Sequence, residues 1–269
     1  MPNKNKQQEI PSQIIKAADL ADASWRPILL DGLQAMMEEN PAYLPTLVNE
    51  DYLPSRGWMF GAFTQPLPNV HYVLVGEGPY PREESATGVC FMDGAVKELW
   101  SEKGLSKPVN RATSLRNFMK MLLVTEGYLS IEKTSGDALA IVAEKALHPE
   151  NNFIQTLPDL QENLTRHGFL LLNASLVYRP NVPPLKEAKA WQPLLQKVLC
   201  ALADHADTHA KTPPTLVLWG KVAELLSSIP ENSRFPKAIS EHPYNLSFIS
   251  NPVMQALFGP MRLLQKQDS

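Results

Sequence analysis

Cysteine is scarce in this sequence: only Cys90 and Cys200 occur, far apart and outside any CxxC pair. A disulfide-stapled secreted fold is therefore excluded, and a reduced, cytoplasmic protein is expected. The first residues are polar and lack the apolar core of a signal peptide, so no leader is expected. No apolar run has the length needed to cross a bilayer, which argues against an integral membrane protein.

An excess of positive charge is also missing. The chain carries 25 Lys and Arg against 28 Asp and Glu, a formal net charge of −3, so any footprint for nucleic acid must be local. Its 24 prolines are spread among apolar segments and indicate stiffened loops rather than disorder. No internal repeat, linker or charge block divides the 269 residues. We therefore expect one domain over residues 21–269, after a flexible segment over residues 1–20.

Four short apolar runs have the composition of buried β-strands, at residues 70–75, 169–172, 215–219 and 236–240. Segments with apolar residues at helical spacing lie between and around them. The clearest of these are 25–37, 114–123, 137–147, 190–202, 222–227 and 254–265. This alternation predicts an α/β fold, a three-layer α/β/α arrangement around a short, mostly parallel four-stranded central sheet.

Polar or glycine-containing segments follow the predicted strands. Residues 76–80, Asn173, Gly220 and His242 each stand just beyond the carboxyl end of one strand. In parallel sheets, ligands bind beyond these ends. One shared site at this edge of the sheet is therefore expected.

The first of these segments, GEGPYP at 76–81, combines glycines with prolines. Glycines let a ligand approach the backbone closely, and prolines hold the turn in one shape. A GxG pattern after a strand also invites a dinucleotide-binding interpretation, which requires a third glycine and an immediate helix start. Pro81 stands where that glycine would be, so the dinucleotide interpretation is weak.

Two other patterns suggest different chemistry. His205 and His209, spaced i,i+4, could bind a metal ion, but they lie where the helix before the third strand should run out, and a solvated turn is the simpler interpretation. Cys90 could be a nucleophile, but its apolar neighbours predict a buried, inert thiol. No metal and no cofactor is expected.

An ordered set of motifs accompanies the strand ends: GEGPYP at 76–81, GVCF at 88–91, LLLNASL at 170–176, LVLWG at 216–220 and HPYNLS at 242–247, with FGAF at 60–63 and SLRN at 114–117 in matching context. In order and spacing, this set resembles the uracil-DNA glycosylase superfamily, and most closely its uracil-excising main branch, whose first motif is GQDPYH. Each motif is only moderately specific alone. Their order along the chain, from about Ser24 to the C-terminus, is a strong signal.

The resemblance implies a monomeric enzyme of base-excision repair that flips uracil out of single- or double-stranded DNA and hydrolyses its N-glycosidic bond. Phe91 would stack on the base, and Tyr80 would exclude the methyl group of thymine. Asn173 would read the O4 and N3–H edge, because one amide both donates and accepts. Taken alone, Phe91 fits a core position and Asn173 fits a turn cap equally well.

The resemblance also implies roles for the later motifs. His242 would hydrogen-bond uracil O2 and stabilise the uracil anion, and the backbone of Gly76 and Gly78 would line the base. Leu246 would be the wedge that fills the gap left by the flipped nucleotide. Without the resemblance, His242 would be interpreted as a structural histidine and Leu246 as an ordinary loop leucine.

Contacts to the DNA backbone are expected from Ser247, Lys221, Lys107 and Pro108. For each, a solvated surface position is the alternative. Additional local positive charge is expected from Arg179, Lys103, Arg111 and Arg116.

The first motif departs from the family at its centre. Gly78 occupies the position of the family's aspartate, which is credited with positioning water and supporting the cationic sugar. Losing such a group typically costs about 10²–10⁴ in rate. Glu77 and Glu241 are the candidate replacements, and Glu77 joins His242 as a predicted catalytic residue. Glu77 stands one residue before the position of the family's aspartate. In a strand-end turn, such a shift usually points the side chain in the opposite direction.

Gly78 therefore keeps three functions open. The first is uracil excision, the second is excision of a different or modified base, and the third is non-hydrolytic binding of uracil or abasic DNA.

Overall fold

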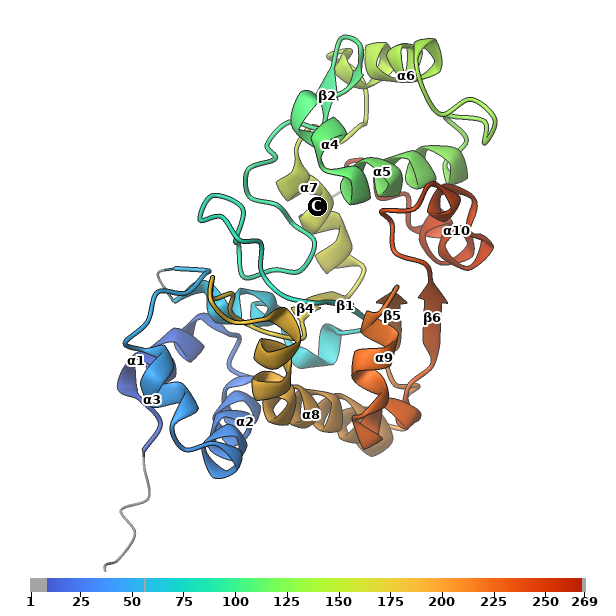
Figure 1. The fold of residues 1–269 in the computed structure, drawn as a ribbon. Coiled ribbons are helices and arrows are strands. Elements are labelled where there is room, and N and C mark those ends of the chain that lie inside the picture. The colour runs from blue at the N-terminus through green and yellow to red at the C-terminus, as the bar shows by residue number, and fades with distance from the viewer. Residues whose placement is uncertain (1–8, 56, 268–269) are drawn as a thin grey trace, which may run out of the picture.

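A parallel sheet of four short strands forms the middle of the molecule (Figure 1). The computed structural model describes residues 9–55 and 57–267. The strands are β1 (Tyr72–Gly76), β4 (Phe169–Asn173), β5 (Thr215–Trp219) and β6 (Lys237–Ser240), in the order β4-β1-β5-β6. Each adjacent pair runs parallel. Helices lie on both sides, which confirms the predicted α/β fold.

Alternate residues of the strands face two separate hydrophobic cores. On β1, Val73 and Val75 point into one core and Leu74 into the other. On β5, Leu216 and Leu218 share the core of Val73, while Val217 belongs to the second. This two-residue period of an extended chain explains why the strands read as unbroken apolar runs.

One core lies under the helices α2 (Arg26–Glu39) and α8 (Pro184–Thr208), which pack against each other. Gly32 makes the close approach possible, since a Cβ there would lie 3.0 Å from Leu194 Cα. The other elements of this layer are α1 (Ser12–Ala17), η1 (Ala18–Leu20), α3 (Tyr43–Leu47), η2 (Trp58–Phe63), η3 (Leu67–Asn69), α9 (Val222–Ser227) and η4 (Pro230–Arg234).

The opposite core lies under α5 (Thr113–Thr125), α7 (Leu157–Arg166) and α10 (Pro252–Phe258) (Figure 1). A two-stranded hairpin, β2 (Trp100–Ser101) and β3 (Gly104–Leu105), covers its outer end with the helix α6 (Asp137–Leu147). The remaining elements of this layer are α4 (Lys107–Arg111), η5 (Leu246–Ser250) and η6 (Gly259–Met261).

The outer edge of β4 is covered by side chain and loop. The Gln65 amide donates to Phe169 O at 2.7 Å, and the Cys90 N–H donates to Leu171 O at 3.0 Å. These bonds satisfy carbonyls that an edge strand would otherwise leave open.

The N-terminal segment departs from the prediction. Residues 12–20 form α1 and η1, and Ile14 and Ala18 are fully buried in the core under α8, so the flexible segment predicted over 1–20 is wrong for this part. Residues 1–8 of that prediction lie outside the described residues. Burial of two apolar side chains, rather than strong helix propensity, explains the order of this short helix.

Two helices have different bounds from those predicted. The helix expected over 190–202 runs from Pro184 to Thr208, so Pro193 lies in its interior and the turn predicted around His205 is helical. Burial of Trp191 and Leu195 against the core outweighs the cost of the interior proline. The closing helix stops at Phe258, because Pro260 lacks the N–H that would continue it.

Among residues 9–55 and 57–267, no helix combines the length and apolar character that crossing a membrane requires.

Substituting Gly88 by Ala is expected to lower the free energy of unfolding by more than about 3 kcal/mol. A Cβ at this position would lie 1.9 Å from the Trp58 carbonyl oxygen, and φ is +77°. Gly127 is the matched control, because its φ is +81° and a Cβ there meets nothing within 4 Å. Gly127→Ala should cost only about 1–2 kcal/mol. Urea unfolding followed by tryptophan fluorescence measures both. Equal losses would show that the clash with Trp58 is relieved at little cost.

Candidate active site

The carboxyl ends of β1 and β4 meet at Gly76 and Asn173, which are direct partners in the parallel register. A Cβ on Gly76 would lie 2.5 Å from Cys90 Sγ and 2.8 Å from Asn173 Oδ1. Only glycine leaves room for both side chains at this point. The end of β1 therefore presents bare backbone between an amide and a thiol, as the glycines of the first motif predict.

Asn173 is buried, with 5% of its surface exposed. Throughout the described part of the chain, its side-chain amide has no hydrogen-bond partner. The amide offers two donors and an acceptor to a ligand. The strand end thus holds a buried residue whose hydrogen-bonding groups are free to bind one.

Phe91 adopts a left-handed backbone conformation, with φ +67°. Such a conformation in a residue other than glycine costs on the order of 1–3 kcal/mol and clusters at ligand sites. Its ring makes edge contacts with Trp219, 5.1 Å between centroids, and with Phe118, 5.4 Å. The Tyr80 hydroxyl points at Phe91 O across 3.4 Å. Phe91 and Trp219, at the end of β5, therefore lie together, and the Tyr80 hydroxyl lies near the Phe91 backbone.

The Cys90 thiol lies beside Gly76, in the buried position that the sequence predicts. It is free and buried, and burial raises its pKa to about 12. The thiolate that a nucleophile requires is therefore absent near neutral pH. Burial likewise raises the pKa of the Tyr80 phenol, so Tyr80 stays protonated.

His242 follows β6 and is held in one tautomer. Its Nδ1 accepts the Tyr244 N–H at 3.1 Å, so the neutral ring carries its proton on Nε2. Loss of solvation lowers the pKa of His242 below its usual value of about 6.5, and the Glu77 carboxylate acts in the opposite direction. Gly220 lets the loop approach, since a Cβ there would lie 3.1 Å from His242 Cβ. The imidazole is thus a neutral donor at pH 7.

Asn117 holds the loop that carries His242. It is fully buried on α5, and its amide donates to Pro243 O at 2.8 Å, Tyr244 O at 3.3 Å and Asn245 O at 3.4 Å. The Asn245 N–H in turn donates to His242 O at 2.9 Å. Sequence reasoning noted SLRN at 114–117 but assigned it no role. The signal was a polar residue on an otherwise apolar helix face.

Glu241, one of the two candidate replacements for the missing carboxylate, is engaged elsewhere. The Ser247 hydroxyl and the Asn251 amide, the latter at 2.8 Å, hold the pKa of its carboxyl below the usual range. Both donors belong to the loop and to the start of α10, so Glu241 stabilises that loop. The prediction that Ser247 grips a phosphate remains a prediction.

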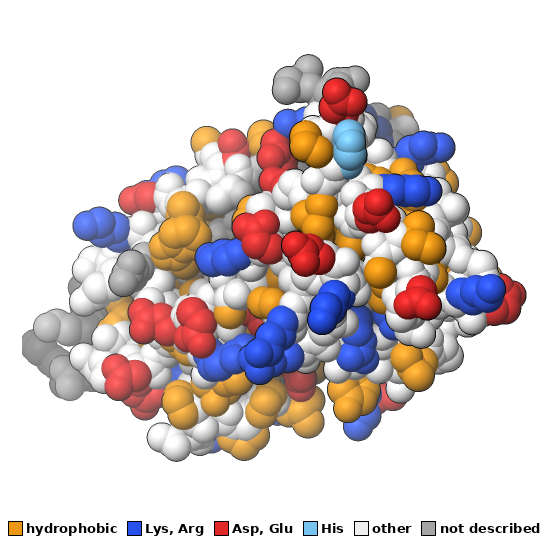
Figure 2. Space-filling model, turned by 90° about the horizontal axis from the view of Figure 1, so that it is seen from above, with side chains coloured by type: hydrophobic (Ala, Val, Ile, Leu, Met, Phe, Trp, Pro, Cys, Tyr) orange, Lys and Arg blue, Asp and Glu red, His pale blue; other side chains and the backbone are white. Residues whose placement is uncertain are grey.

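The residues expected to contact DNA are exposed. Leu246 begins η5 with 69% of its surface exposed, beside Tyr244 with 68%. Lys221 precedes α9, while Lys107 and Pro108 begin α4, and all three are at the surface. Figure 2 shows Lys and Arg side chains gathered near the middle of one face, bordered by acidic ones. Any positive field is therefore local, as the net charge of −3 predicts.

A cavity of about 240 Å³ lies next to the first motif. It is lined by Glu77, Gly78, Pro79, Pro81, Ser175, Val177, Tyr178, Arg179, Val182, Pro184 and Glu187. A Cβ on Gly78 would lie 3.7 Å from Ser175 Cβ, an ordinary contact, so a side chain fits there.

In the part of the chain that the structure describes, the exposed Glu77 carboxylate has no hydrogen-bond or ion-pair partner. Arg179, expected to add free positive charge, is instead paired with two carboxylates.

The histidine pair does not form part of a larger ligand set. His205 and His209 lie near the end of α8, with ring centroids 4.2 Å apart. Within residues 9–55 and 57–267, no group of three or more His, Cys, Asp or Glu side chains is placed to hold a metal ion.

Comparison with known proteins settles the family. No family model matches the chain. The crystal structure of the wild-type UNG from Nitratifractor salsuginis superimposes with a TM-score of 0.83, is 36% identical, and covers 99% of this chain and 100% of its own. The chain belongs to the uracil-DNA glycosylase superfamily. Proteins named uracil-DNA glycosylase are also similar, including one from Parafrankia sp., 28% identical over 87% of this chain and 84% of its own.

A second named relative comes from Nocardioides sp., 27% identical over 197 residues, which are 73% of this chain and 66% of that protein. Membership of the uracil-DNA glycosylase superfamily confirms the resemblance that the strand-end motifs predict. The roles of individual residues stay predictions.

A pH titration of His242 by NMR should give a pKa below 6.5 and the shifts of an Nε2–H tautomer. Glu77→Gln should lower this pKa further, because the carboxylate favours the imidazolium. His148 is the internal control, an exposed histidine whose Nδ1 also accepts a backbone N–H, from Glu150 at 3.3 Å. A His242 pKa that rises or stays constant in Glu77→Gln would contradict the coupling between the two side chains.

Proposed function

We propose that this protein excises uracil from DNA by hydrolysing the N-glycosidic bond, as a step of base-excision repair. The observation that carries the proposal is the buried Asn173 amide, which lacks a protein partner and stands beside the bare backbone of Gly76. The 36% identity to a UNG of known structure supports the same reaction class.

Recognition uses the groups around the end of β1. Asn173 donates to uracil O4 and accepts from N3–H, which satisfies its amide. Phe91 stacks on the base, and Tyr80 stands where the methyl group of thymine would go. Flipping the nucleotide costs a few kcal/mol, and the exposed Leu246 fills the gap in the stack.

Bond cleavage sends negative charge onto the base. As the C1′–N1 bond breaks, its electron pair leaves with uracil and charge builds on O2. The neutral His242 Nε2–H and the Gly78 N–H donate to that oxygen, and a neutral donor avoids giving up a proton to a weakly basic anion. Water then adds its oxygen to C1′, keeps one hydrogen as the new sugar hydroxyl, and releases the other, which balances the protonation of uracil.

The sugar carries the complementary positive charge, as in other glycosyl transfers. Glu77 is the candidate to stabilise it, because its carboxylate is unpaired within the described residues and lines the cavity that begins at Gly78. Its field also reaches His242. This supports Glu77 in the electrostatic role, whereas Glu241 is occupied by its own loop.

The DNA backbone on either side of the flipped nucleotide is held by Ser247, Lys221, Lys107 and Pro108. Such contacts position the strand and carry no base specificity. The binding partner is therefore uracil-containing DNA, single- or double-stranded.

Uracil-containing oligonucleotides, treated with protein and then alkali, test the proposal. Asn173→Ala and His242→Ala should each slow strand breakage about 10²–10³-fold, because each removes a preorganised donor. His148→Ala should break strands at the wild-type rate, since this exposed histidine follows α6 and is not among the residues of the candidate site. Retained binding of uracil DNA with no breaks on uracil, hypoxanthine or mismatch substrates would sink the enzyme proposal in favour of a non-hydrolytic binder. Breaks only on another base would favour a different specificity.

Gly78→Asp should raise the excision rate about tenfold or more, because the site has room for the side chain and lacks a carboxylate there. Gly78→Asn is the matched control, with the same size and no charge. Single-turnover rates at pH 7.5 separate the two. A Gly78→Asp enzyme no faster than Gly78→Asn would mean that the carboxylate function is already supplied from another position.

A further inference from the structure

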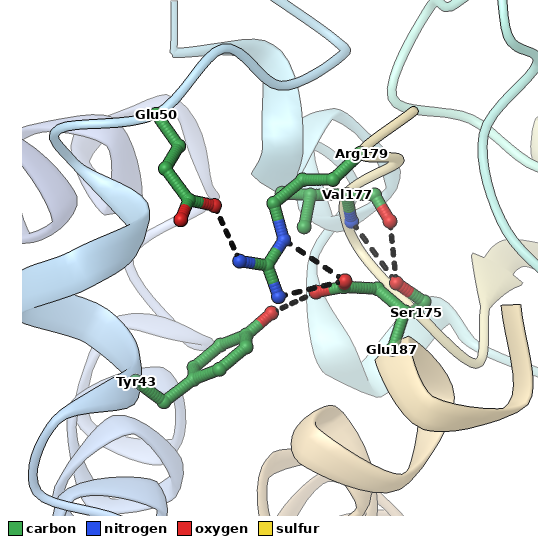
Figure 3. Close-up of polar contacts among 6 residues, drawn as sticks. All are labelled: Tyr43, Glu50, Ser175, Val177, Arg179 and Glu187. Carbon is green, nitrogen blue, oxygen red and sulfur yellow. Dashed lines mark hydrogen bonds and ion pairs between the residues drawn. The ribbon is translucent and has the colours of Figure 1, made fainter. Parts of the chain in front are cut away.

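Arg179 is the centre of an ion-pair network with Glu50 and Glu187 (Figure 3). Arg179 and Glu187 also line the cavity at Gly78. Arg179, with 12% of its side chain exposed, binds Glu187 Oε2 through Nε at 3.0 Å and Nη2 at 2.9 Å. Its Nη1 binds Glu50 Oε2 at 2.6 Å. The Tyr43 hydroxyl donates to Glu187 Oε1, and the guanidinium lies 5.2 Å from the centre of the Tyr43 ring.

The network joins the cavity wall through the turn after β4. Ser175 donates to Val177 O at 2.6 Å and accepts the Val177 N–H, which directs the chain toward Arg179 (Figure 3). Ser175, Arg179 and Glu187 all line the cavity with Gly78. The absence of a side chain at Gly78 therefore leaves open space between the first motif and these groups.

The network carries one net negative charge. Two carboxylates surround one guanidinium, and the phenol stays neutral because burial and Glu187 raise the pKa of Tyr43. Burial alone lowers the pKa of Arg179, but Glu50 and Glu187 outweigh it, so the guanidinium stays charged. Lys186 and Lys189 are exposed and line a second cavity of about 210 Å³, where water screens them. The 3% exposure of the Glu187 side chain leaves its charge poorly screened.

We propose that the Glu50–Arg179–Glu187 network stabilises the positive charge that develops on the sugar, and that the cavity beside Gly78 receives that sugar and the attacking water. This inference rests on the proposed uracil excision. Both Glu187 oxygens already accept hydrogen bonds, so the network acts through its field and takes no proton. Fixed charges that need no rearrangement are the efficient form of such stabilisation.

The network also ties α3 to α8, so its most buried members are poor probes. Glu187 variants would leave the Tyr43 hydroxyl without its acceptor and Arg179 with Glu50 as its remaining carboxylate, so the protein would unfold more easily. Glu50 is the better probe, because 45% of its side chain is exposed. Glu50→Gln removes one negative charge and keeps a group that accepts from Arg179.

Glu50→Gln should lower the single-turnover excision rate about fivefold, with unchanged affinity for uracil DNA and an unchanged midpoint of unfolding. Asp31→Asn is the matched control. Its carboxylate is 60% exposed and pairs with Lys197 at 2.8 Å, on the surface of α2. The loss in Glu50→Gln should shrink as salt is raised. Glu50→Asp, which keeps the charge, should retain the rate. A fivefold loss shared by Glu50→Gln and Glu50→Asp would reveal a structural role and overturn the proposal.

The Gly78→Asp background gives a second, independent readout. The fields of fixed charges add, so Glu50→Gln should cost about the same factor beside a carboxylate at position 78, which a double-mutant cycle measures. A loss that disappears in the Gly78→Asp background would overturn the proposal that the network acts through its field. If the wild type excises uracil and Glu50→Gln matches it, only the network inference fails. If the wild type excises no uracil, the proposed function itself fails.

Discussion

The parallel register of β1 with its two neighbours is the constraint on which the site depends. Gly76 pairs with Asn173 on one side, and the register with β5 places Trp219 and Gly220 at the same edge on the other. Because all four strands end together, groups nearly a hundred residues apart in sequence become neighbours without any long side chain reaching across. The bare backbone of Gly76 then decides how closely they approach.

The two layers of the molecule contribute different chemistry to this edge. The layer with α5 and α10 supplies the aromatic contacts of Phe91 and, through Asn117, the orientation of the His242 loop. The layer with α3 and α8 supplies the charges of Arg179 and Glu187. In the proposed reaction, the base would meet neutral, hydrogen-bonding groups, and the sugar would meet the negatively charged Glu50–Arg179–Glu187 network. That separation matches a reaction in which opposite charges develop on the two fragments.

The sequence predicts the strands and the residues that follow them, because short apolar runs buried on both faces leave an unambiguous pattern. It does not predict the length of α8. The burial of Trp191 and Leu195 in the core stabilises the helix through Pro193, and this tertiary effect is not visible in the local sequence. The role of Asn117 and the Tyr43–Glu187 contact also escape sequence reasoning. The sequence separation between the partners is 126 residues for Asn117 and Pro243 and 144 residues for Tyr43 and Glu187. A polar residue on an apolar helix face marks Asn117 as unusual, but nothing local identifies its partner.

The hydrogen bond from the Cys90 N–H to Leu171 O means that the loop at the candidate site also covers the edge of the sheet. With Gln65, the loop occupies the outer hydrogen-bonding positions of β4, where another extended chain could otherwise add on. One peptide group therefore links the candidate site to the protection of the sheet edge. Loosening the loop would uncover the outer carbonyls of β4, so its sequence is restricted even at positions away from the candidate site.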